Sequence, residues 1–90
     1  MGKKTIIKQY EQLKEFFKKR NWHIDDKEMC FELDNLLIYY KEDHEQWRLK
    51  NTLHTGCYLT MDITRVSFPF DEKEQKRLWR ICSKNHRLRN

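Results

Sequence analysis

The chain has 90 residues, of which 38% are hydrophobic and 13% aromatic, and a formal net charge of +5 at neutral pH. This length suits one compact domain with a single core, so we treat residues 1–90 as one domain. No run approaches the ~20 apolar residues of a membrane span, and we expect no signal peptide because the start lacks an apolar segment. Three cysteines without tight spacing argue against a disulfide scaffold and indicate the cytoplasm.

Basic and acidic residues concentrate in different segments of the chain. Residues 1–20 carry seven Lys/Arg and two acids, residues 21–74 carry six and twelve, and residues 75–90 carry six and none. The cations thus concentrate in two terminal segments that we expect to be helices, which indicates one anion-binding surface. The chain also lacks alanine and has one valine. That composition resembles AT-rich coding and hints at a low-GC bacterium, its phage or plasmid, or a virus.

The first expected element is a helix over residues 5–20. Its apolar side chains recur at helical spacing: Ile6, Tyr10, Leu13 and Phe17. Cations crowd its C-terminal end, where the helix dipole favours positive charge: Lys18, Lys19 and Arg20. Asn21 is a plausible stop signal.

Short strands are expected next. Residues 29–33 alternate between apolar and polar, and Asp34-Asn35 then forms a two-residue hairpin turn. Residues 36–41 are apolar on both faces, as in a central strand, and residues 46–50 alternate again.

The longest expected strand covers residues 57–68. The apolar residues of this strand switch from one face to the other near Thr64-Arg65, which predicts a bulge or a break there. Tyr58 lies on the polar side of this strand, and with Arg48, Lys50 and Thr60 it is expected to pattern the outer sheet face. A single exposed tyrosine is ordinary, so we assign it no role.

The last helix is expected over residues 72–85. Asp71 followed by Glu74 resembles a capping box, and residues 86–90 are expected to be a frayed basic tail. The predicted fold is therefore α+β: a helix, three or four antiparallel strands and a helix, with both helices on one sheet face.

Cations recur along this last helix at spacings of three and four residues: Lys73, Lys76, Arg77, Arg80, Lys84 and Arg87. Such a ridge presents positive charge at steps of roughly 5–6 Å, which suits repeated phosphates. We expect the anion contacts to come from both helices: Lys18, Lys19, Arg20, Lys76, Arg77, Arg80, Lys84 and Arg87. The alternative is a solvated helix face whose cations merely suit the helix dipole.

Four side chains have the types that bind zinc: His54, Cys57, Cys82 and His86. Both cysteines fall on predicted core faces, where a free cysteine packs as a small apolar group. We therefore expect no metal and no cofactor. No motif for nucleophilic or acid–base catalysis stands out either, so we do not expect an enzyme.

Two functions follow from this sequence. The first is a small nucleic-acid- or nucleotide-binding accessory protein, whose basic last helix contacts phosphates with little base specificity. The second is a protein-interaction module, such as a phage- or plasmid-encoded inhibitor or adaptor, that docks on an oppositely charged protein. The oligomeric state does not follow from the sequence.

Overall fold

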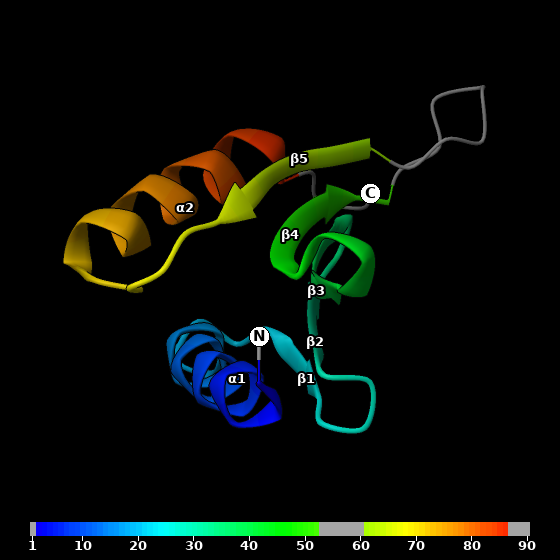
Figure 1. The fold of residues 1–90 in the computed structure, drawn as a ribbon. Coiled ribbons are helices and arrows are strands. Elements are labelled where there is room, and N and C mark those ends of the chain that lie inside the picture. Colours follow the sequence, from blue (N-terminus) through cyan, green and yellow to red (C-terminus); the bar gives the residue numbers. More distant parts are fainter. Residues whose placement is uncertain (1, 53–60, 87–90) are drawn as a thin grey trace.

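The computed structural model describes residues 2–52 and 61–86. Within these residues the chain forms two α-helices and a five-stranded antiparallel sheet with the strand order β1-β2-β3-β4-β5 (Figure 1). The elements are α1 (Lys3–Lys18), β1 (His23–Asp25), β2 (Cys30–Leu33), β3 (Leu36–Lys41), the 3-10 turn η1 (Glu42–His44), β4 (Gln46–Asn51), β5 (Met61–Val66) and α2 (Glu72–Asn85). The predicted α+β architecture is confirmed, with one more strand than expected.

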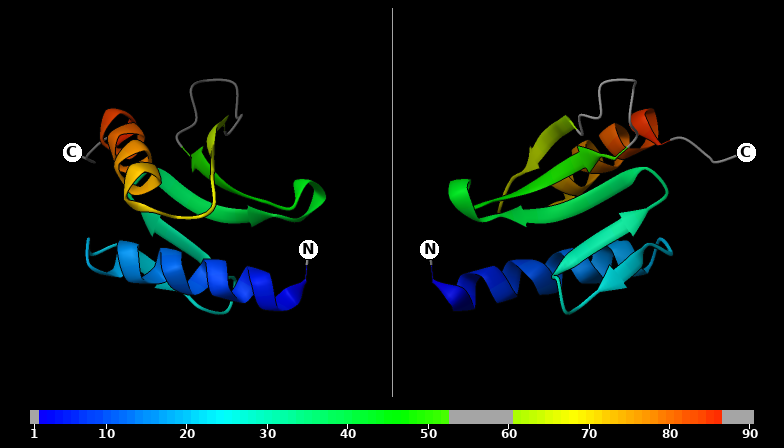
Figure 2. Two further views of the ribbon diagram at one scale, coloured as in Figure 1. Left: turned by 60° about the vertical axis from the view of Figure 1, so that its left-hand side comes forward. Right: turned by 90° about the vertical axis from the view of Figure 1, so that its right-hand side faces the viewer.

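Both helices pack on the same face of the sheet, as predicted. In the right-hand view of Figure 2 the strands lie in front of the helices, and the C-terminal ends of α1 and α2 lie on the same side of the molecule. Side chains from both helices and from the sheet meet in one core and are almost completely buried: Leu13, Phe17, Phe31, Ile38, Trp47, Leu49 and Leu78. The opposite sheet face has no helix over it among the described residues.

The α1 helix begins and ends two residues earlier than predicted. It starts after Gly2, and the chain leaves it through Asn21, whose φ of 62° lies in the left-handed region. The N–H of Trp22 donates to the carbonyl of Phe17 at 3.1 Å, which satisfies one of the last helical acceptors. The predicted stop at Asn21 therefore corresponds to the turn after α1. Neither described helix is long and apolar enough to cross a membrane.

The β2–β3 hairpin turns through Asp34 and Asn35, as predicted. Leu33 pairs with Leu36, and Asp34 has a φ of 49°. Strand β1 was not predicted because only Ile24 of its three residues is apolar. Ile24 pairs with the buried Phe31, so tertiary packing makes this short segment a strand.

Strand β5 contains a bulge close to the predicted place. Leu49 pairs with Thr64 whereas Lys50 pairs with Asp62, so Ile63 is the extra residue. The strand ends at Val66 rather than at residue 68, and residues 57–60 of the predicted strand lie outside the described residues.

Contacts at both ends hold α2 against the sheet. At its N-terminus, Asp71 accepts a hydrogen bond from the N–H of Glu74 at 2.9 Å. At its C-terminus, the buried Asn35 donates to the carbonyl of Asn85 at 2.8 Å. His86 was predicted to be part of a frayed tail, but its Nε2 lies 2.6 Å from Asp34 Oδ2. This contact fixes the end of α2 on the β2–β3 turn.

Candidate functional site

The cations that the sequence assigned to one ridge on α2 divide into two groups. Arg77 lies against the edge of β5 and makes four hydrogen bonds, two to Glu74 of its own helix and two to Thr64 and Arg65 of β5. Lys73, Lys76, Arg80 and Lys84 lie on the outer face of α2 and are exposed. We call this second group the α2 ridge.

Arg77 and Glu74 together satisfy the edge of β5. Arg77 donates from Nε to Glu74 Oε1 and from Nη2 to Oε2, both at 2.6 Å, and from Nη2 to the carbonyl of Arg65 at 2.7 Å. Glu74 Oε2 accepts from the N–H of Ser67 at 2.8 Å. The pair thus supplies one donor and one acceptor to backbone groups beside which the described part of the chain places no further strand.

The Glu74 side chain does not take the position that a capping box requires. Asp71 caps the helix as expected, but the Glu74 carboxylate turns toward β5 and its side chain is only 9% exposed. Burial raises the pKa of Glu74, while the hydrogen bonds from Arg77 and from the N–H of Ser67 outweigh burial, so that the pKa lies below its ordinary value. Glu74 is therefore a charged residue held by its partners, and Arg77 is a structural residue.

The α2 ridge has little acidic compensation. Lys76 forms an exposed ion pair with Glu72 at 3.3 Å, which contributes little to stability. Lys73, Arg80 and Lys84 have no acidic partner among the described residues. These three side chains remain available to an anion from solution.

An open groove of about 540 Å³ runs beside the ridge. One wall is the loop after β5, with the half-buried Phe68 and the exposed Pro69, and the other wall contains Lys73, Lys76 and Arg80. The surface is therefore cationic with an apolar border. The carboxylates of Asp71 and Glu74 also line the groove, where Asp71 caps α2 and Glu74 pairs with Arg77.

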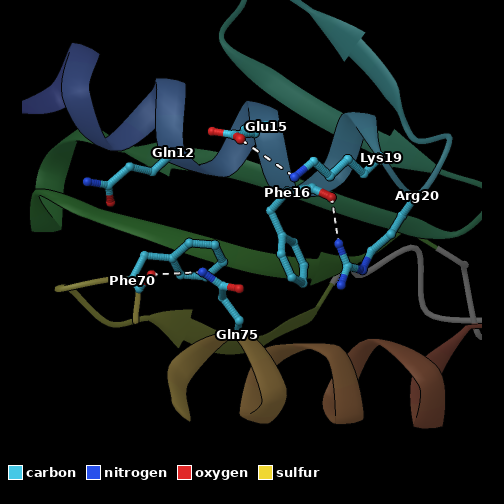
Figure 3. A pocket seen from close by; sticks show the side chains of 7 residues that line it. All are labelled: Gln12, Glu15, Phe16, Lys19, Arg20, Phe70 and Gln75. Carbon is cyan, nitrogen blue, oxygen red and sulfur yellow. Dashed lines mark hydrogen bonds and ion pairs between the residues drawn. The ribbon is translucent and has the colours of Figure 1, made fainter. Parts of the chain in front are cut away.

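The cations at the end of α1 do not join the ridge. Lys19 and Arg20 line a separate groove of about 350 Å³ between the two helices, shown in Figure 3. The Arg20 guanidinium lies 3.6 Å from the centroid of the Phe16 ring and 5.0 Å from that of Trp79, and Nη1 donates to the Phe16 carbonyl. Arg20, just after the C-terminal end of α1, thus packs against an aromatic ring of each helix.

The cations of the two helices thus lie along different grooves, and the expectation that both sets bind anions stays a prediction. Lys19 pairs with Glu15 at 3.6 Å in the interhelical groove, and the exposed Lys18 lines neither groove. The α2 ridge faces a different groove, because its cations project from the side of α2 that lies beside the loop after β5. Arg87, also predicted for the site, lies outside the described residues.

The described part of the chain does not bring the four possible zinc ligands together. Cys82 is 2% exposed in the core, where burial raises its pKa to about 12, and His86 contacts Asp34. His54 and Cys57 lie outside the described residues. Among the described residues no cluster of three His, Cys, Asp or Glu side chains has the geometry to hold a metal ion.

A second cluster of cations, on the outer sheet face, was not predicted as a site. Cross-strand pairing places Tyr39, Arg48 and Arg65 in one row across β3, β4 and β5. The sequence indicated that Arg48 and Lys50 face outward, but not that Arg48 would lie opposite Arg65. Tyr58 and Thr60, which it placed on this face, lie outside the described residues.

Comparison with known proteins identifies no relative: no protein-family model, no curated protein and no solved structure matches this chain.

Proposed function

We propose that this protein binds nucleic acid, and that the α2 ridge contacts the phosphate backbone. The observation that carries the proposal is that Lys73, Arg80 and Lys84 are exposed on one helix and have no acidic partner among the described residues. From Lys73 to Lys84 the helix rises roughly 16 Å, which spans several phosphates of a nucleic acid.

The binding energy would come mainly from release of the counterions that surround the phosphates. Lysine side chains act as mobile point charges, and Arg80 adds a planar donor group that can grip a phosphate with two hydrogen bonds. None of these groups forms a rigid set of donors aimed at a base edge, so the proposal includes little sequence preference.

Fluorescence anisotropy with labelled single- and double-stranded DNA and RNA at several salt concentrations tests the proposal. The informative variant is K73E/R80E/K84E. Its matched control is K3E/K4E/K8E, which makes the same charge change on exposed positions of α1. We expect the ridge variant to bind at least tenfold more weakly than the control and to show a smaller salt dependence, lower by about 2–3 units for three lost contacts.

Equal affinities of the two variants would show that net charge, not the ridge, attracts the ligand. Absence of binding by the unmodified protein at low salt would remove the proposal altogether.

The groove beside the ridge supports a second candidate, a protein-interaction module of the kind that phages and plasmids encode. The apolar wall of Phe68 and Pro69 next to Lys73 and Arg80 suits an acidic segment that carries an apolar side chain. Under this candidate a partner captured from a lysate stays bound after nuclease treatment, and F68A weakens capture while leaving oligonucleotide affinity unchanged.

We further propose that the protein acts in the cytoplasm. Cys30 and Cys82 are both unpaired thiols, which is typical of proteins in a reducing compartment.

A further inference from the structure

The outer face of strands β3–β5 carries a second concentration of positive charge. Alternation along the strands places one set of side chains on this face, away from both helices: Leu37, Tyr39, Lys41, Gln46, Arg48, Lys50, Asp62 and Arg65. The right-hand view of Figure 2 looks onto the strands from this side. The set contains four cations and one acid, although it belongs to the part of the sequence whose net charge is negative.

Two of these cations lie directly opposite each other. Arg48 on β4 pairs in register with Arg65 on β5. Like charges opposite each other on neighbouring strands destabilise a sheet, since their side chains are about 5 Å apart at the Cβ atoms. An anion between the two guanidinium groups would turn this repulsion into attraction.

Arg48 also has an unsatisfied donor. Its Nε is buried and has no hydrogen-bond partner among the described residues. A buried donor without an acceptor is costly, and in native proteins it usually has a water, an ion or a ligand beside it. This observation is independent of the pairing with Arg65, and it leaves Arg48 with a donor for which the described residues supply no acceptor.

The single acid on this part of the face is already engaged. Asp62 accepts from the Tyr39 hydroxyl at 2.6 Å and pairs with Lys41 at 3.3 Å. Lys50 Nζ lies 5.4 Å from the centroid of the Tyr39 ring. The cluster therefore combines an aromatic ring with two guanidinium groups in the same row, neither of which forms an ion pair within the described part of the chain.

We propose that this outer face is a second phosphate-binding site, centred on Arg48 and Arg65, for a single-stranded segment of nucleic acid. The inference rests on the proposed function and names the form of nucleic acid that the protein takes. A single strand is required because the Tyr39 ring and the flat guanidinium groups can stack on bases only where those bases are unpaired.

The site adjoins the α2 ridge across the edge of β5. Arg77 joins the two elements, since its Nη2 donates to the carbonyl of Arg65 while its own helix carries the ridge. A strand bound on Arg48 and Arg65 would continue over β5 toward Lys73 and Arg80. The two surfaces then act as one path for a flexible strand, whereas a rigid duplex contacts the ridge alone.

The variant R48Q/R65Q tests the proposal, with K4Q/K8Q on α1 as the matched control of equal charge. The probes are a labelled oligothymidylate of about 20 nucleotides, longer than the sites of known single-strand-binding folds, and a duplex of similar length. We expect R48Q/R65Q to weaken oligothymidylate binding about tenfold relative to the control and to lower its salt dependence by about 1.4. Duplex affinity should change less than twofold.

Several results would overturn this inference alone. One is equal affinity of R48Q/R65Q and K4Q/K8Q for the single strand while the ridge variant K73E/R80E/K84E loses binding. Another is an equal loss by R48Q/R65Q on single strand and duplex. If the unmodified protein binds neither probe, the proposed function fails and the inference fails with it.

Removal of the opposed charges should leave the thermal midpoint of R48Q/R65Q unchanged or raised. If R48Q disturbs folding, R65Q alone provides the test, because Arg65 is exposed and only its backbone carbonyl contacts Arg77. We expect R65Q to lower the salt dependence of oligothymidylate binding by about half as much as R48Q/R65Q does. If R65Q and K8Q bind this probe with the same salt dependence, the proposal is contradicted.

Discussion

Replacement of Arg77 by alanine should destabilise the fold, whereas replacement of Arg80 should not. The two residues are neighbours on one helix and the sequence gives them the same role. In the structure Arg77 holds the Glu74 carboxylate and the carbonyl of Arg65, while Arg80 is exposed and has no acidic partner among the described residues. The substitution R77A leaves the nearly buried Glu74 charge with the N–H of Ser67 as its remaining partner.

The expected loss is about 2–3 kcal/mol of the free energy of unfolding. Removal of one partner of a buried pair costs about 3–5 kcal/mol, and a net hydrogen bond to a charged group contributes about 1.5–3 kcal/mol. The Arg77 side chain is 38% exposed, so water can replace part of what is lost, and the value should fall below the upper range. For a domain of this size the thermal midpoint should fall by roughly 10–20 °C.

Urea and thermal unfolding followed by circular dichroism measure this difference, with R80A as the matched control. The double variant E74Q/R77M removes both charges and keeps an acceptor for the N–H of Ser67. We expect it to recover at least half of the loss, because the main cost in R77A is the uncompensated Glu74 charge. Oligonucleotide binding should show the opposite order, with R80A weakened and folded R77A nearly unchanged.

If R77A and R80A differ by less than about 0.5 kcal/mol, Arg77 does not hold the β5 edge, since exposed substitutions give changes of that size. A double variant no more stable than R77A would show that the lost contacts of Arg77, rather than the charge left on Glu74, cause the effect. Either result would refute the structural role given to the pair.

Four further predictions concern single groups. Because the pKa of Glu74 is lowered on folding, its contribution to stability should be complete above its ordinary value of 4.5 and lost as pH falls below it, and E74Q should flatten acid unfolding in this range. D71A should reduce the free energy of unfolding by about 1 kcal/mol in urea titrations, because the N–H of Glu74 loses its cap. Cys82 should resist alkylation in the native protein, as peptide mass spectrometry would show, because burial raises its pKa to about 12. Burial and the hydrogen bond to Asp62 raise the pKa of Tyr39 to about 12, so absorbance titration of D62N should give a lower value.

The sequence predicts best those elements that have both a regular spacing of apolar residues and a residue that marks where the element begins or ends. The bounds of α2 agree with the prediction because Asp71 marks its start and the apolar spacing is helical throughout. Strand β1 has neither signal, since a single Ile24 gives no period, and it forms because Phe31 offers a partner. Local patterns thus predict long elements, and packing determines the short ones.

The candidate site was less predictable, because it depends on distances between elements. Helical spacing puts Arg77 and Arg80 on one ridge, and only the position of the β5 edge separates their roles. The opposition of Arg48 and Arg65 depends on the register of β4 and β5, which includes a bulge one step away. A sequence pattern gives the face of each strand but not which residue lies across from it.

The structure also changes the meaning of the charge pattern along the chain. Several acids of residues 21–74 hold specific partners, among them Asp26 with Lys14, Asp34 with His86, Asp62 with Lys41, Glu74 with Arg77, and Asp71 with the N–H of residue 74. These carboxylates hold turns and helix ends in place, so part of the negative charge of this segment is structural. The cations on the outer face of β4 and β5 come from the same segment, and none of them forms an ion pair among the described residues, although Lys50 lies opposite Asp62. The nucleic acid that we propose as the ligand would therefore meet positive charge on two adjoining sides of β5.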